Sequence, residues 1–90
     1  MKPHKAIEYK IPIKKALKEL GGSGTSEQIY NKVKKYITPN DEDLQLLVRK
    51  DKTINYTISR NMHSHALRLL LKEKAIERVK DYPKTYKLLI

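Results

Sequence analysis

The sequence contains no cysteine, only three glycines and no long apolar run. The lack of cysteine excludes a disulfide framework, a cysteine-ligated zinc site and a thiol nucleophile, and it is in keeping with a cytoplasmic protein. No apolar segment approaches the roughly 18–20 residues of a membrane span, and no apolar stretch of a signal peptide follows the basic residues 1–5. Few glycines and scattered carboxylates leave little for a nucleotide-binding loop or an acid/base site. We therefore expect no catalytic residue, cofactor or metal, and no membrane partner.

The chain has the size of one small domain. It comprises 90 residues, of which 39% are hydrophobic. A domain of this length buries about 60–65% of the surface of its unfolded chain, which predicts a small core. We expect a single domain over residues 1–90, with residues 1–10 as a flexible N-terminal arm.

Positive charge dominates the sequence and is unevenly distributed. Twenty Lys and Arg residues stand against ten Asp and Glu residues, for a net charge of +10. Such a charge attracts polyanions, either nucleic acid or an anionic membrane surface, although it also serves as a solubilising surface. Residues 53–71 hold no acidic side chain but two arginines and two histidines: Arg60, His63, His65 and Arg68. Because acidic residues gather instead at 41–43, the distribution favours a directed basic face and nucleic acid as the partner.

The first half of the chain predicts helices with recognisable ends. Apolar residues recur at helical spacing from Ile11 to Leu20, and Gly21-Gly22 follows as a helix stop. Residues 23–25 suit a short strand. The pattern T-x-x-Q from Thr25 to Gln28 is typical of a capping box that starts a second helix. A cap, a proline and carboxylates at 38–41 predict a third, short helix that ends near residue 49, followed by a polar loop at 50–53.

The second half predicts a long helix and a hairpin. The helix runs from Tyr56 to Lys72, and its apolar stripe contains Ile58, Met62, Ala66, Leu69 and Leu70. Residues 75–79 and 85–89 alternate like strands on either side of a turn at 81–84. The sequence therefore predicts a mainly α protein with a small β-hairpin, an α+β fold in which a three-helix core precedes the hairpin. This is the winged helix-turn-helix arrangement.

In that arrangement the long helix is the recognition helix, and its N-terminal half enters the major groove of DNA. The side chains opposite its apolar stripe are of types that bond base edges or phosphates. They are Tyr56, Thr57, Arg60, Asn61, His63 and Ser64. The hairpin tip, or wing, offers Lys80, Tyr82 and Lys84 to the sugar-phosphate backbone. A solvated surface without a target is the alternative for both sets.

Two further features of the long helix need an interpretation. Leu67 and Leu71 lie away from the apolar stripe, where we expect them to join the core under the hairpin; the alternative is a dimer patch. We accordingly expect a monomer or a weak homodimer. His63 and His65 are two residues apart and point to different faces, unlike the i, i+4 pair of a metal site.

Several stretches resemble the N-terminal winged-helix domain of Mrr-type restriction proteins. They span residues 11–22, 25–30, 65–70, 74–78 and 85–88. His65 stands where the family has tryptophan, and Lys74 occupies a bend that usually favours glycine. The resemblance implies that residues 56–64 and the wing contact DNA. It also implies that nuclease activity would lie in a separate domain of the same parent protein.

We therefore expect a module that binds double-stranded DNA, directed by sequence or base modification. It would be either the targeting domain of a restriction endonuclease or a stand-alone transcriptional regulator. A protein-interaction module and a double-stranded RNA-binding module are the alternatives, since fold does not fix function.

Overall fold

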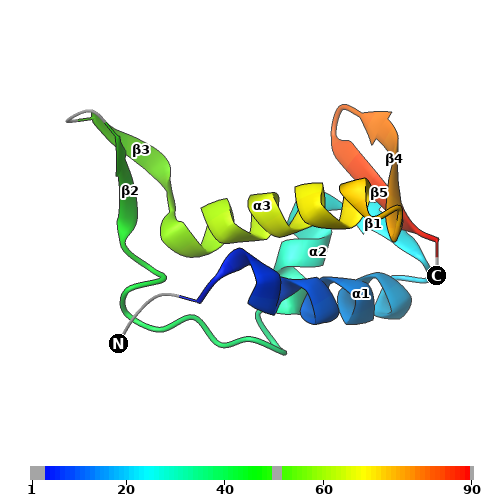
Figure 1. Ribbon diagram of the computed structural model, residues 1–90, viewed down its shortest axis with the longest axis horizontal. Coiled ribbons are helices and arrows are strands. Elements are labelled where there is room, and N and C mark those ends of the chain that lie inside the picture. Colours follow the sequence, from blue (N-terminus) through cyan, green and yellow to red (C-terminus); the bar gives the residue numbers. More distant parts are fainter. Residues whose placement is uncertain (1–3, 50–51, 90) are drawn as a thin grey trace.

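Three α-helices, a three-stranded sheet and a separate two-stranded hairpin make up the part of the chain that the structure describes (Figure 1). A computed structural model describes residues 4–49 and 52–89, and for residues 47–49 and 52–56 it describes the backbone alone. The elements are η1 (Ala6–Tyr9, a 3₁₀ turn), α1 (Lys10–Glu19), β1 (Ser23–Thr25), α2 (Ser26–Val33), β2 (Leu46–Arg49), β3 (Lys52–Thr57), α3 (Ile58–Lys72), β4 (Ile76–Asp81) and β5 (Lys84–Leu88). The protein is a small α+β domain, as the sequence predicts.

The first helix begins and ends close to the predicted residues, and the second begins where predicted; it ends at Val33, before Ile37, which the apolar spacing assigns to it. Gly21 and Gly22 follow α1 with φ angles of 85° and 104°, in the left-handed region that glycine adopts without strain. The capping box of α2 is complete. The amide of Gln28 donates to the hydroxyl of Thr25 at 3.1 Å, and the amide of Thr25 donates to the side chain of Gln28 at 2.9 Å.

The apolar core lies between α1, α2 and the C-terminal half of α3, and side chains from the sheet complete it. Its buried residues are Tyr9, Ile13, Ala16, Leu17, Ile29, Val33, Ile37, Ala66, Leu67, Leu70, Ala75, Ile76 and Tyr86. Leu67 is buried and Leu71 packs partly buried against the core. The expectation that these two leucines are core residues is confirmed.

The C-terminal hairpin is confirmed where the sequence places it. β4 and β5 pair antiparallel, and β5 also pairs with β1, which gives the order β1-β5-β4. Lys74 makes the bend between α3 and β4 with a φ of 61°. A residue with a Cβ atom therefore adopts, at this bend, the left-handed conformation that usually favours glycine.

The prediction of a short helix between residues 38 and 49 is wrong. Residues 41–44 form a turn, and β2 follows as one strand of an antiparallel hairpin with β3. Asn40 and Asp43 exchange bonds that close the turn: each backbone amide donates to the other residue's side chain, at 2.9 Å in both cases. Such side-chain bonds compete with helical ones, so the carboxylates after Pro39 fold a turn rather than start a helix. Lys52 and Thr53, predicted in a loop, belong to β3, and residues 50–51 lie outside the described residues.

Asp43 is fully buried and joins this turn to the N-terminal segment and to α3. The amide of His4 donates to Oδ1 of Asp43 at 2.7 Å, and Nδ1 of His4 lies 2.5 Å from Oδ2. The carbonyl of Asp43 accepts from the amide of Ser59 at 2.8 Å. Burial alone would raise the pKa of Asp43, but the bonds from Asn40 and His4 outweigh it and hold that pKa below its ordinary value.

A second polar cluster fixes the start of α3 against α2 and η1. The fully buried hydroxyl of Ser59 lies 2.8 Å from the hydroxyl of Tyr9 and accepts from the hydroxyl of Tyr30 at 3.0 Å. Burial raises the pKa of Tyr9 to about 12, although the bond to Ser59 acts in the opposite direction. The N-terminal half of α3 is therefore held through hydrogen bonds.

The predicted apolar stripe of α3 is correct only in part: Ala66 and Leu70 are buried and Met62 packs partly buried against the core, whereas Leu69 is exposed. The helix begins at Ile58 rather than Tyr56, because Thr57 is extended and accepts from the amide of Arg60 at 3.2 Å as the N-cap. Ile58 and Met62 are partly buried and Leu69 is 37% exposed. The buried positions of the helix are Ser59, Asn61, His63, Ala66, Leu67 and Leu70. The first half of α3 thus buries polar side chains that a hydrophobicity pattern does not count.

Candidate nucleic-acid interface

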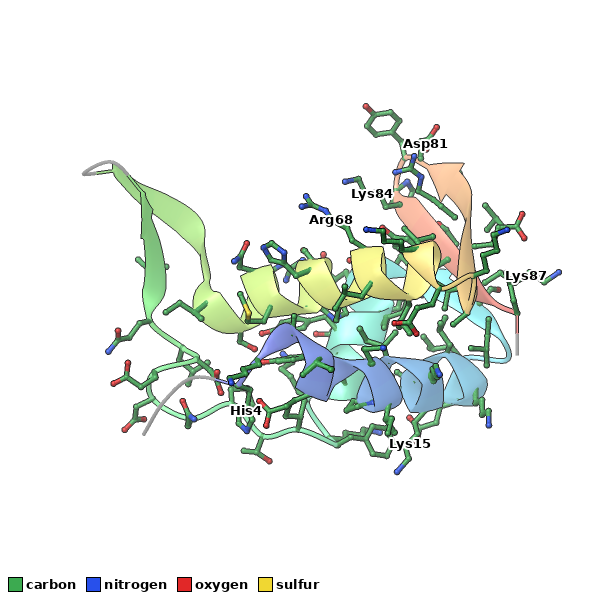
Figure 2. The ribbon with its side chains drawn as sticks, viewed as in Figure 1. His4, Lys15, Arg68, Asp81, Lys84 and Lys87 are labelled. Carbon is green, nitrogen blue, oxygen red and sulfur yellow. The ribbon has the colours of Figure 1, made fainter. Side chains whose placement is uncertain are left out.

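A groove of about 410 Å³ runs beside α3, next to the first residue of α2 and the first residue of β5. Its lining is Ser26, Arg60, Asn61, Ser64, His65, Arg68 and Lys84. Four of these residues, Ser26, Ser64, Arg68 and Lys84, also line an adjoining hollow of about 140 Å³ that extends to Arg78 and Tyr86. Figure 2 shows Arg68 and Lys84 on the same side of α3. The two hollows form one polar, basic surface from α3 to the wing.

The cations of this surface differ in how far they are neutralised. Arg60 lies 3.6 Å from a carboxylate oxygen of Glu27 and 5.2 Å from the ring centre of Tyr30. Arg78 pairs with Asp81 at 3.2 Å. Arg68 and Lys84 are exposed and form no ion pair with any described residue. Since no carboxylate lines the groove, these two cations are available to an anionic partner.

Asn61 is the most enclosed polar side chain of the groove. Asn61 as a whole is 8% exposed, and its side-chain amide group makes no hydrogen bond within the described residues. The prediction that Asn61 is solvent-exposed is wrong, but the structure still places it in the lining of the groove. An amide there carries two donors and an acceptor that a bound partner can use.

Among the other residues predicted on the recognition helix, Arg60 and Ser64 lie at the surface and line the groove. Tyr56 and Thr57 are not in the helix: they end β3, and the side chain of Tyr56 lies outside what the structure describes. Thr57 uses its hydroxyl to cap α3.

His63 is buried, and its predicted place on the exposed face is wrong. It is 1% exposed, its Nε2 lies 3.3 Å from the carbonyl oxygen of Ser26, and its ring centre lies 5.0 Å from that of Tyr30. Nδ1 finds no hydrogen-bond partner in the part of the chain that the structure describes. Burial lowers the pKa of His63 to about 4, with a smaller contribution in the same direction from Arg60. The ring is therefore neutral near pH 7 and joins α3 to the start of α2.

The three residues predicted at the wing all lie at the surface. Lys80, Tyr82 and Lys84 are exposed, and Tyr82 is 90% exposed at the turn of the hairpin. Of the three, Lys84 is the one that lines the groove. The wing thus offers two lysines and an aromatic ring to a partner.

Three residues that line the groove are absent from the predicted contact residues: Ser26, His65 and Arg68. Asn61, Ser64 and Arg68 follow one another at intervals of three and four residues, which puts them on one helical face. That spacing was the available signal, and the wrongly placed apolar stripe obscured it. Ser26 gives no such signal, because only the packing of α2 beside α3 brings it to the groove.

Among the described residues no group of three or more potential metal-binding side chains gathers, and no helix there is long and apolar enough to cross a membrane. Comparison of the chain with protein families, with curated proteins and with solved structures finds no match.

Proposed function

We propose that this protein binds duplex DNA through α3 and the wing. The observation that carries the proposal is the groove beside α3, whose lining contains Arg60, Arg68 and Lys84 but no carboxylate. Two of these cations lack an ion-pair partner among the described residues. A cation held at the surface without a counter-charge releases condensed counterions from DNA when it meets a phosphate, which favours binding.

The architecture supports this use of the groove. The helices α1, α2 and α3 followed by an antiparallel hairpin, with the sheet order β1-β5-β4, fit a winged helix-turn-helix. In helix-turn-helix proteins the recognition helix lies in the major groove. The surface residues of α3 would then face base edges, and those of the wing would face the backbone.

The residues divide by the chemistry that each can supply. Arg68 and Asn61 can make the paired hydrogen bonds by which arginine recognises guanine and asparagine recognises adenine. Ser64 and the wing residues Lys80 and Lys84 suit phosphate oxygens, and Tyr82 can pack on the sugar-phosphate backbone. The phosphate contacts would set the position of the protein, and the α3 contacts would set its sequence preference.

The finer proposal is that the domain targets a nuclease that lies in another part of the same parent protein, as the resemblance to Mrr-type restriction proteins implies. A stand-alone transcriptional regulator is the alternative, and either would act in the cytoplasm on the nucleoid. A protein-docking module built on Leu67 and Leu71 is disfavoured, since Leu67 is 2% exposed and packs in the core.

The test is a titration with a 20-base-pair duplex over a range of salt concentration. If several phosphates are contacted, log K falls against log[salt] with a slope of roughly −4 to −6. A flat dependence would exclude DNA binding through this surface. Arg68→Ala should weaken binding by about tenfold and relax base preference, whereas Lys84→Ala should weaken all sequences alike and reduce the slope by about one.

The matched control is Lys15→Ala. Lys15 projects from α1 on the side of the molecule opposite Arg68 (Figure 2), so its loss removes one charge without touching the groove. An equal loss of affinity in this variant would show that net charge, rather than the groove, drives binding.

A further inference from the structure

The groove beside α3 has the size of a small-molecule site. Its volume of about 410 Å³ lies within the range of such sites, about 300–1,000 Å³. Small-molecule sites are mostly lined by apolar side chains, whereas this groove is lined by hydroxyl, amide, imidazole and cationic groups and by no carboxylate. A small molecule that fits the groove is therefore polar and anionic.

The groove and the adjoining hollow share four residues, which form an anion site next to the wing. They are Ser26 of α2, Ser64 and Arg68 of α3, and Lys84 of β5. The two cations form no ion pair, and the two hydroxyls make no hydrogen bond, within the described residues. Arginine and lysine bind phosphate through charge-assisted hydrogen bonds, and hydroxyls donate to its oxygens. The anion site thus has the groups that hold a phosphate.

Asn61 lies at the other end of the groove, since it lines the groove but not the adjoining hollow. It is 8% exposed, and its side-chain amide group makes no hydrogen bond within the described residues. Buried polar groups are nearly always hydrogen-bonded, so this amide group points to a partner that enters the groove. An asparagine amide can form paired hydrogen bonds with the edge of an adenine base.

The two ends of the groove are separated by the length of one nucleotide. About two turns of α3 lie between Asn61 and Arg68, which corresponds to roughly 10 Å along the helix axis. A nucleoside monophosphate spans a similar length from its phosphate to the outer edge of its base. We propose that the groove binds a nucleoside monophosphate, with the phosphate in the anion site and the base against Asn61.

This site does not depend on DNA binding, but its consequence does. If the proposed function is correct, a free nucleotide competes with DNA for the same groove, so that the nucleotide concentration regulates DNA binding.

The test is a titration of the full chain with adenosine monophosphate (AMP), without DNA and at constant ionic strength, followed by two-dimensional amide NMR spectra. The shift changes should saturate and should concentrate at the residues that line the groove. Inorganic phosphate and adenosine should each bind at least about tenfold more weakly than AMP, because each makes only one of the two sets of contacts.

Two variants separate the two ends of the site. Arg68→Ala should weaken AMP binding by about tenfold and leave adenosine binding unchanged. Asn61→Leu keeps the size of the side chain and removes its amide, so AMP should bind no better than inorganic phosphate, whose own affinity should not change. The NMR spectra also report folding, and Asn61→Ala replaces Asn61→Leu if that variant does not fold.

The matched control is Lys87→Ala. Lys87 lies on the same strand as Lys84, is exposed and is not in the lining of the groove (Figure 2). This variant should keep the AMP affinity of the wild type. A loss equal to that in Arg68→Ala would show attraction to net charge alone and would overturn the site.

Competition connects the site to the proposed function. When the AMP concentration equals the dissociation constant of AMP, the apparent dissociation constant of the duplex should rise about twofold. If AMP binds and the duplex does not, the nucleotide site stands and DNA binding fails. If both bind without competition, the nucleotide site stands and its regulation of DNA binding is wrong.

Two outcomes would overturn the nucleotide site while DNA binding stands. One is salt-dependent binding of the duplex with no saturable shift changes on addition of AMP. The other is AMP binding that equals the binding of inorganic phosphate or is unchanged in Asn61→Leu, because the base would then make no contact with the groove.

Discussion

The two halves of α3 are held in place by different kinds of interaction. In the first half the buried side chains are polar: Ser59 bonds to two tyrosine hydroxyls, and His63 lies against the backbone of α2. In the second half Ala66, Leu67 and Leu70 pack in the apolar core. Apolar burial is non-directional, whereas hydrogen bonds fix distance and angle. The half that lines more of the candidate groove is thus the half whose orientation is set by directional contacts.

The largest expected effect lies in the apolar half. Leu70→Ala should lower the free energy of unfolding by about 2–5 kcal/mol, because Leu70 is fully buried and its loss leaves a cavity. Urea denaturation followed by circular dichroism measures this. Leu69→Ala is the matched control: Leu69 is 37% exposed, so the loss should stay below about 1 kcal/mol. Equal losses would mean that the helix is rotated from the orientation described.

In the first half of α3, where the buried side chains are polar, we expect the free energy of unfolding to fall in acid. His63 has its pKa lowered from 6.5 to about 4 by burial. The folded state therefore binds the proton more weakly than the unfolded state, and stability that is complete above pH 6.5 is lost as the pH falls toward 4. The loss amounts to about 3 kcal/mol. Urea midpoints measured from pH 7 to pH 4 test this.

His63→Leu should flatten that pH profile, while His65→Leu on the partly exposed side of the helix should keep it. The pKa of Asp43 is also lowered, so its protonation in acid destabilises the folded state as well. That loss of stability sets in mainly below pH 4, because the carboxyl group of the unfolded chain begins to bind protons there. An unchanged profile in His63→Leu would assign the acid sensitivity to another group.

Loss of the Ser59 hydroxyl should have a smaller effect on the free energy of unfolding, and this effect should not depend on pH between 7 and 4. Ser59→Ala removes the shared partner of Tyr9 and Tyr30 and leaves two buried hydroxyls without it, at a cost of about 1–3 kcal/mol. A double-mutant cycle with Tyr9→Phe isolates the interaction. Additive losses in the cycle would contradict the proposed coupling of the two hydroxyls.

The contrast between the halves also explains which parts of the fold could be predicted. Gly21-Gly22 and the capping box of Thr25 and Gln28 act through bonds within a few residues, so the sequence alone locates the end of α1 and the start of α2. The C-terminal hairpin was predictable for the same reason, since alternation and turn chemistry are local. In the second half of α3, apolar periodicity correctly identified Ala66 and Leu70 as core residues.

Hydrophobicity alone could not show which face of the first half of α3 is buried. An apolar pattern favours Ile58 and Met62 as core residues, yet Ser59 and His63 take the fully buried positions. Ser59 bonds to the hydroxyls of Tyr9 and Tyr30, and Nε2 of His63 lies against the carbonyl of Ser26. Those partners are up to 50 residues away in the sequence. The segment before β2 was predicted as helix because Pro39 and the carboxylates after it suit a helix start, whereas the side-chain bonds between Asn40 and Asp43 close a turn there. The bonds from His4, 39 residues away, add a contact to Asp43 that no local pattern shows. The groove was predicted in part: the predicted contact residues include Arg60, Asn61, Ser64 and Lys84, but not Arg68, although its helical spacing from Asn61 and Ser64 is a local signal.

The smallest expected effect concerns Lys74, two residues after the last residue of α3. Lys74 has a φ of 61°, a conformation that costs a residue with a Cβ about 1–2 kcal/mol and glycine much less. Glycine also gives the unfolded chain more freedom, which offsets part of the gain. Lys74→Gly should therefore raise the free energy of unfolding by up to about 1 kcal/mol, measured by urea denaturation. Lys72→Gly, the same change inside the last turn of α3, should lower it by about 1 kcal/mol. Opposite signs from two identical substitutions so close together can come only from the backbone conformation, and equal signs would place the end of the helix elsewhere.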